Sequence, residues 1–128
     1  MPRDWDLIRL ILLRLDEKPT SASAVGPAEI PEHPAELVSY QIRLLLDSGL
    51  VDGTWPTRGG HLFCVAKSLT WDGHEFLDKT RSLTVWHRIK GILRDKGLDL
   101  SFDAIKAAAL IVILELQDFH CHYPVKQD

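Results

Sequence analysis

The feature that most restricts the fold is a turn-rich stretch in the middle of the chain, Pro56-Thr57-Arg58-Gly59-Gly60. It separates two strand-like segments, residues 50–55 and 61–69. A proline followed by two glycines favours a chain reversal, and the flanking segments suit a pleated surface. The sequence therefore predicts a β-hairpin over residues 50–69.

Two helices are predicted before this hairpin. Over residues 4–16 apolar side chains recur at helical spacing, and Asp4 is placed to cap the first turn. The second helix spans residues 34–47, with Pro34 at its first position and Gly49 ending it. Residues 18–34 between them carry four prolines, which exclude a regular helix but leave room for a short extended piece at residues 28–30. The buried side of the second helix is expected to comprise Leu37, Val38, Leu44, Leu45 and Leu46.

Three further helices are predicted after the hairpin. Thr70 is placed to cap a short helix that runs to about residue 81. A helix over residues 84–96 ends at Gly97, and Ser101 caps a last helix that runs to about residue 119. Of the four tryptophans, Trp5, Trp71 and Trp86 are expected to be core residues, whereas Trp55 beside the turn is expected to be exposed.

The order helix, connector, helix, β-hairpin, helix is typical of a winged helix. We therefore predict an α+β, mainly α fold in which residues 1–128 form a single domain. Residues 1–82 form the core, with the wing at 50–69, and residues 83–128 add C-terminal helices. Two local patterns support this prediction: Leu46-Asp47-Ser48-Gly49-Leu50 is similar to the exit from a winged-helix recognition helix, and Leu69-Thr70-Trp71-Asp72-Gly73 to the step from the wing into the next helix.

The chain also resembles a family of unknown activity, domain of unknown function 2513, over nearly its whole length. The segments that carry the resemblance are residues 3–9, Tyr40 with Leu44-Leu45, residues 69–77, Val85-Trp86 and residues 100–103. Gln41 departs from the pattern, because a histidine is expected after the tyrosine. The resemblance implies a winged-helix-like fold and a bacterial or phage origin, and it brings no catalytic residues.

The leading functional hypothesis is a DNA-binding accessory protein or transcriptional regulator that binds double-stranded DNA. In a winged helix the exposed face of the recognition helix enters the major groove and the wing contacts phosphates. On that basis the candidate DNA contacts are Ser39, Tyr40 and Arg43 on the helix, with Arg58 and Lys67 on the hairpin.

The alternative hypothesis is a protein–protein interaction module on a winged-helix scaffold that no longer binds DNA. The candidate recognition face carries Glu36 and Asp47 beside a single cation, Arg43, which can pair with Asp47 four residues on. The prolines have also removed the helix that normally supports a recognition helix. The whole chain is slightly acidic, with 15 Lys and Arg against 18 Asp and Glu.

No enzymatic activity, metal or cofactor is expected. His120-Cys121-His122 and the set His61, Cys64 and His74 lack the spacing of a zinc site. No glycine-rich phosphate loop or nucleophile motif is present. Two cysteines fit a reducing compartment, and neither a signal peptide nor a membrane span is apparent, so a cytoplasmic protein is expected.

The last predicted helix suggests a homodimer. One of its faces is apolar throughout, which is enough to pack it on the rest of the domain. Leu110, Ile111 and Leu114 lie on the other side, among charged residues. Exposed aliphatic side chains in a group often mark an interface, and we expect these three to pair with a second copy. The alternative is that the helix is simply buried more deeply.

Overall fold

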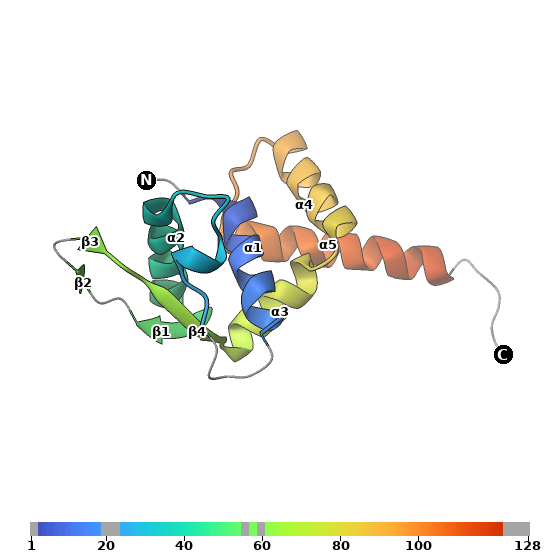
Figure 1. The fold of residues 1–128 in the computed structure, drawn as a ribbon. Helices are drawn as coiled ribbons and strands as arrows, with labels where there is room; N and C mark the ends of the chain where they lie inside the picture. Colours follow the sequence, from blue (N-terminus) through green and yellow to red (C-terminus); the bar gives the residue numbers. More distant parts are fainter. Residues whose placement is uncertain (1–2, 19–23, 55–56, 59–60, 122–128) are drawn as a thin grey trace. The chain divides into compact units, whose positions relative to one another are not determined.

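The computed structural model describes residues 3–18, 24–54, 57–58 and 61–121 (Figure 1). These residues divide into two compact units, one within residues 1–78 and one within 79–128. Five helices and an antiparallel two-stranded ladder in the described part confirm the predicted α+β, mainly α class. In chain order the elements are α1 (Trp5–Asp16), the 3₁₀ turn η1 (Pro27–Glu29), α2 (Ala35–Ser48), β1 (Val51–Thr54), β2 (Thr57–Arg58), β3 (His61–Leu62), β4 (Val65–Leu69), α3 (Trp71–Thr80), α4 (Leu83–Asp95) and α5 (Phe102–Cys121).

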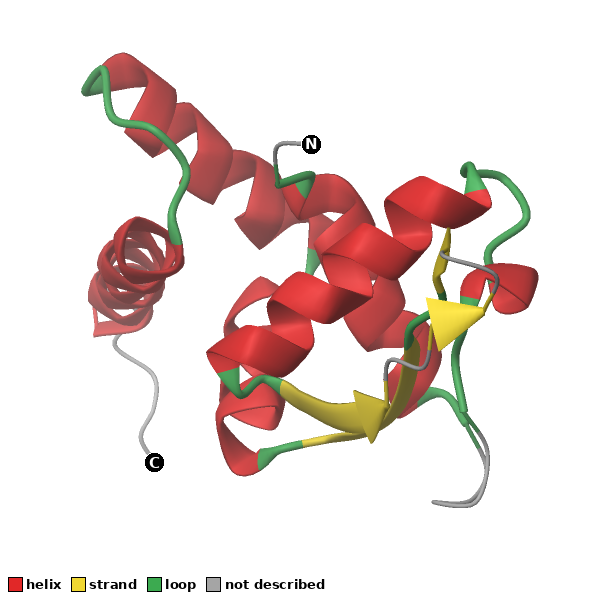
Figure 2. Cartoon of the chain, turned by 90° about the vertical axis from the view of Figure 1, so that its left-hand side faces the viewer, coloured by secondary structure: helices red, strands yellow, loops and turns green. Residues whose placement is uncertain are grey.

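The predicted hairpin is confirmed. β1 pairs antiparallel with β4, from Val51 opposite Leu69 to Thr54 opposite Val65, and an irregularity follows Asp52. β2 and β3 form a second short ladder nearer the turn. Figure 2 shows the end of α2 leading directly into β1.

The connector adds one backbone bridge to this hairpin, because Val25 pairs with Ala66 of β4. The extended piece expected at residues 28–30 is wrong, since residues 27–29 form η1 instead. Pro27 supplies the φ angle that a first helical turn needs. The Glu29 carboxylate accepts a hydrogen bond from the Gly26 N–H at 2.7 Å, which closes the turn.

The core of the first unit is formed by apolar side chains from its helices, its connector and its hairpin. On α2 the prediction is partly wrong: Val38 and Leu45 are buried, but Leu37, Leu44 and Leu46 are half-buried. The hairpin packs beside α2. The side of α2 that is buried is not centred on Leu37, Leu44 and Leu46. The buried apolar residues are Leu7, Ile8, Ile11, Leu12 and Leu15 of α1, Val25 and Ile30 of the connector, Val38, Ile42 and Leu45 of α2, Leu50, Val51, Cys64 and Ala66 of the hairpin region, and Phe76 and Leu77 of α3.

A buried glutamine joins the first two helices. The Gln41 side chain is fully buried, and its Oε1 accepts a hydrogen bond from the Asp4 N–H at 2.9 Å. The Asp4 carboxylate in turn accepts a hydrogen bond from the Leu7 N–H at 3.1 Å and caps α1 as predicted. Because a buried amide without partners would destabilise the fold, these bonds hold the start of α1 against α2.

Thr70 and Gly73 connect the start of α3 to the end of α2. The Thr70 hydroxyl donates a hydrogen bond to the Gly49 carbonyl at 2.6 Å and accepts one from the Gly73 N–H at 3.1 Å. The Thr70 N–H donates to the Leu50 carbonyl at 3.1 Å. A Cβ atom on Gly73 would lie 2.0 Å from that same carbonyl oxygen. Glycine is therefore needed at residue 73 because two backbone segments approach closely there.

The second unit is a pair of helices. Ser82 and Ser101 cap α4 and α5 through side-chain hydrogen bonds, and Gly97 ends the α4 segment with a φ of 68°. An ion pair joins the helices, with Arg88 Nη2 3.2 Å from Glu115 Oε2. The buried side chains are Trp86, Ile89, Ile92 and Leu93 on α4, and Ile105, Ala108, Ala109 and Val112 on α5.

We expect the substitution Gly73→Ala to lower the free energy of unfolding by about 3 kcal/mol, because the new methyl group overlaps the Leu50 carbonyl. The matched control is Gly91→Ala in α4, where the new Cβ meets only the end of the Arg94 side chain at 3.8 Å. Alanine is the better helix former, so this control should raise the free energy by about 0.5–1 kcal/mol. Urea unfolding curves measure both. Equal effects from the two substitutions would contradict the close approach at Gly73.

Candidate interaction surface

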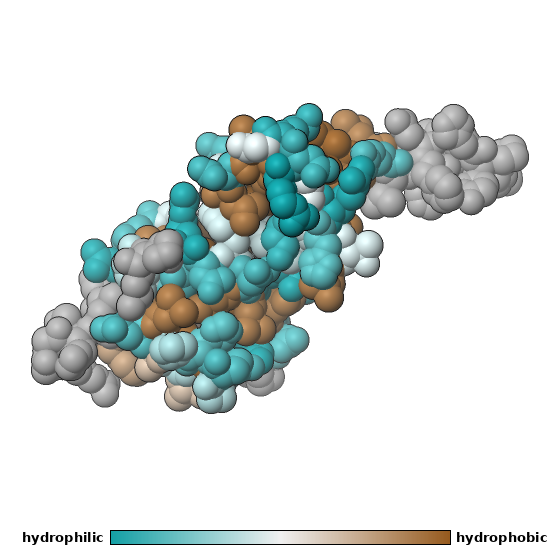
Figure 3. Space-filling model, turned by 90° about the horizontal axis from the view of Figure 1, so that it is seen from above, coloured by the Kyte–Doolittle hydropathy of each residue, from teal (hydrophilic) through white to brown (hydrophobic). Residues whose placement is uncertain are grey.

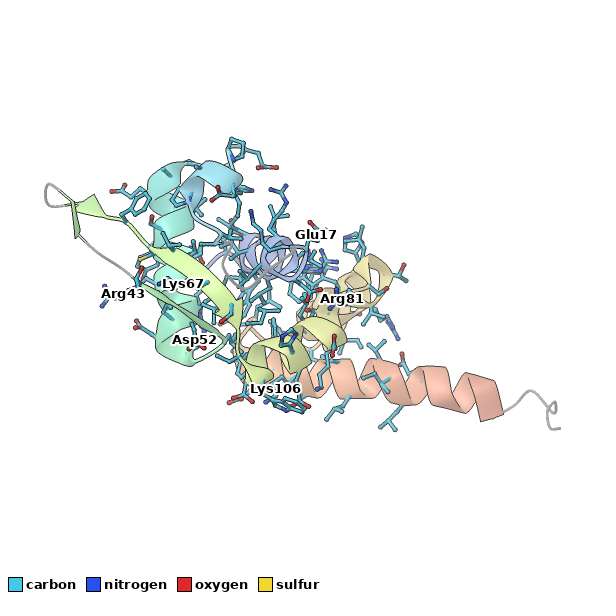
Figure 4. All side chains as sticks on the ribbon, turned by 60° about the horizontal axis from the view of Figure 1, so that its bottom comes forward. Glu17, Arg43, Asp52, Lys67, Arg81 and Lys106 are labelled. Carbon is cyan, nitrogen blue, oxygen red and sulfur yellow. The ribbon has the colours of Figure 1, made fainter. Side chains whose placement is uncertain are left out.

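The outward face of α2 is the candidate recognition surface. Glu36 and Asp47 are exposed, and Tyr40 and Arg43 are half-buried along the same side. Figure 4 shows Arg43 extending outward from the helix. Its Nε lies 3.5 Å from Asp47 Oδ2, so the ion pair that the i, i+4 spacing indicates is formed. The side chains on this face therefore carry two negative charges and one positive charge.

Ser39 does not belong to this face, and its assignment as a DNA contact is wrong. Its side chain is 1% exposed, and its Oγ accepts a hydrogen bond from the Cys64 N–H at 3.3 Å. The segment that leads into β4 covers this side of α2, which helical spacing alone does not reveal. Ser39 serves as a buried hydrogen-bond partner for the hairpin.

Lys67, the hairpin cation whose side chain is described, does not extend the α2 face. Lys67 is exposed on β4, where it lines a shallow hollow of about 160 Å³ with Asp16, Lys18 and His74. Neither Tyr40 nor Arg43 lines that hollow. Arg58 lies in β2, but its side chain is outside the described part of the structure. β1, which packs next to α2, exposes Asp52 and Thr54, so this strand adds a negative charge and no cation (Figure 4).

Several large apolar side chains reach the surface, and Figure 3 shows apolar areas between hydrophilic ones on one face. Trp71 is 78% exposed, so its expected place in the core is wrong; helical spacing puts it opposite the buried Phe76 and Leu77. Trp55, expected to be exposed, lies outside the described residues.

On α5, Leu110, Ile111 and Leu114 are 54%, 41% and 59% exposed. The packing of α5 on α4 within their own unit therefore does not bury these three side chains.

The described part of the chain contains no group of three or more His, Cys, Asp or Glu residues arranged to hold a metal ion. His120 and His122, part of the sequence cluster considered above, fall outside the described side chains. Among the described helices, none combines the length and the apolar character needed to cross a bilayer.

The buried position of Cys64 has a chemical consequence. Removal from water raises the pKa of the Cys64 thiol, because burial disfavours the thiolate. We therefore expect Cys64 to stay protonated at neutral pH and to react slowly with iodoacetamide until the protein unfolds. Mass spectrometry of peptides from native and urea-treated protein measures this difference. Rapid alkylation of Cys64 in the native protein would contradict its burial.

Self-association through Leu110, Ile111 and Leu114 stays a prediction from the sequence, and their exposure makes it testable. If they form an interface, the double substitution Leu110→Asp and Leu114→Asp removes apolar contacts at its centre and shifts a dimer to monomers. Leu98→Asp is the matched control, because Leu98 is 53% exposed in the same unit. Sedimentation equilibrium gives the mass. A wild-type mass equal to that of one 14.5 kDa chain would refute the dimer.

Comparisons with known proteins identify the family. Residues 2–99 match the model of the family described as hypothetical protein (DUF2513). A protein of Haemophilus influenzae named "Uncharacterized protein" is 40% identical over 116 residues, which cover 91% of this chain and 98% of that protein. No solved structure matches the chain. The chain belongs to the DUF2513 family, as its resemblance to that family predicts.

Proposed function

We propose that this protein is a non-enzymatic protein-interaction module on a winged-helix scaffold, and that its recognition-helix face is not used to read DNA. The order of elements is compatible with a winged helix, with α2 in the position of the recognition helix and β1–β4 as the wing. The observation that carries the proposal is the charge on α2, where the Arg43 guanidinium lies beside the Asp47 carboxylate.

This charge pattern is unfavourable for contact with DNA. Proteins bind the phosphate backbone mainly by neutralising it with lysine and arginine. Here the approach of a duplex would bring Glu36, Asp47 and Asp52, all exposed, toward the phosphates. Arg43 would have to exchange the Asp47 carboxylate for a phosphate or a base, which would leave Asp47 facing the duplex. The repulsion therefore remains whichever partner Arg43 takes.

The segment that precedes α2 in the chain also argues against DNA binding. In a helix-turn-helix a helix before the recognition helix crosses the DNA backbone. In this chain the corresponding place is taken by the three-residue turn η1. Arg14 of α1 holds this connector through the Glu29 carbonyl at 2.7 Å and the Glu32 carboxylate at 3.0 Å. The arginine is thus occupied in bonds within the chain.

DNA binding remains the rival function, and the order of elements together with Arg43 and Arg58 favours it. A titration of random duplex DNA, followed by fluorescence anisotropy at low and near-physiological salt, separates the two functions. We expect no rise in anisotropy at either salt concentration. Binding that weakens steeply with salt and is lost in Arg43→Glu, but not in the control Arg94→Glu, would refute the proposal.

A gain-of-function variant sharpens this test. If the carboxylates on α2 are what excludes DNA, the double substitution Glu36→Gln and Asp47→Asn should create salt-sensitive binding that the wild-type protein lacks. Both side chains are exposed, so the fold should be retained. Continued absence of binding by this variant would show that the two carboxylates on α2 are not what excludes DNA.

A further inference from the structure

The backbone beside Trp71 is fixed by hydrogen bonds, and most of the residue is in solvent. It is the first residue of α3, and the Thr70 hydroxyl fixes the backbone on both sides of it through Gly49 and Gly73. The indole is nevertheless 78% exposed, the highest value among the exposed large apolar side chains in the described part of the chain. An exposed tryptophan on an ordered backbone is a frequent centre of binding energy at protein interfaces, because little freedom is lost when it is covered.

The surroundings of Trp71 on α3 are acidic. Helical spacing places Glu75 and Asp78 on the same side of the helix as Trp71, at i+4 and i+7. Asp72 follows directly, and all three carboxylates are exposed. The opposite side of α3 carries Phe76 and Leu77, which are buried. The exposed face therefore presents one aromatic ring beside three carboxylates, with the exposed His74 also on this side at i+3.

Each of the other described tryptophans has a cation over its ring, supplied by the chain itself. The Arg3 guanidinium lies 5.4 Å from the ring centroid of Trp5, and the Lys90 ammonium lies 5.5 Å from that of Trp86. In the described part of the chain no such cation is found over Trp71. The comparison with Trp86 is direct: its cation comes from the residue at i+4, and the residue at i+4 from Trp71 is Glu75. A carboxylate thus stands where a lysine would supply the cation from within the chain.

We propose that the exposed face of α3 binds a cationic side chain, arginine or lysine, of a partner polypeptide over the indole of Trp71. The ring face attracts the cation, and the carboxylates of Asp72 and Glu75 bind its N–H donors. An arginine can bind the ring and the carboxylates at the same time, because its planar guanidinium stacks on a ring and presents several N–H donors. This inference rests on the proposed function and names the chemistry of the partner, a basic segment of a protein.

Binding of a fluorescein-labelled Arg-Gly repeat peptide tests the proposal, with fluorescence anisotropy as the readout and a Glu-Gly repeat peptide as the comparison. We expect the wild-type protein to bind the cationic peptide and not the acidic one. Trp71→Ala should weaken binding about tenfold, and Trp71→Phe should weaken it less because a phenyl ring keeps part of the attraction. The Trp71 side chain is exposed, so these variants should fold, and thermal unfolding verifies it.

The controls separate this site from general charge attraction. Glu75→Lys reproduces at Trp71 the spacing of Trp86 and Lys90, fills the ring face from within the chain and should abolish binding. Asp95→Lys changes the net charge equally at an exposed residue of the other unit and should leave most of the binding intact. Equal losses from the two lysine variants, unchanged binding in Trp71→Ala, or no binding of the cationic peptide would each overturn the proposal. A failed peptide titration together with no DNA binding would remove this inference and leave the proposed function standing.

Discussion

The contact between the end of α2 and the start of α3 determines the geometry of the first unit. Gly49 lets the chain leave α2 in a left-handed conformation with a φ of 80°. Its carbonyl then accepts the Thr70 hydroxyl, and the Leu50 carbonyl lies so close to Gly73 that a Cβ atom has no room there. Two backbone segments 21 residues apart in sequence are thereby fixed against each other, with the hairpin between them.

The two surfaces proposed here both follow from this contact. It sets which side of α2 faces the hairpin, and so it leaves Glu36, Arg43 and Asp47 outward while Ser39 is covered. It also sets the direction in which α3 begins, which leaves Trp71 exposed although Phe76 and Leu77, on the opposite side, are buried. A scaffold compatible with DNA binding thus presents acidic side chains and an aromatic ring, which suit a basic protein segment better than a phosphate backbone.

Local patterns in the sequence predicted the elements well, because caps and glycine exits act over a few residues. The roles of Asp4, Gly49, Thr70 and Ser101 belong to this class. The errors concern contacts across the chain. Helical spacing alone indicates an outer position for Ser39, because it does not show the segment that covers that side of α2, and the partner of Gln41 lies 37 residues away. As a large aromatic residue Trp71 is expected in the core, whereas its position on α3 exposes it. The signal for this exposure in the sequence is the spacing of Glu75 and Asp78, at i+4 and i+7 from Trp71, on a different side of the helix from Phe76 and Leu77.

A two-dimensional amide NMR experiment on the whole protein tests the central claim most directly, because it locates binding on α2 and α3 in the same sample. Addition of the Arg-Gly peptide should shift the indole N–H of Trp71 and the amides at the start of α3, and addition of duplex DNA should leave the amides of α2 unchanged. Shifts on α2 around Arg43 with DNA, and none on α3 with the peptide, would contradict the account.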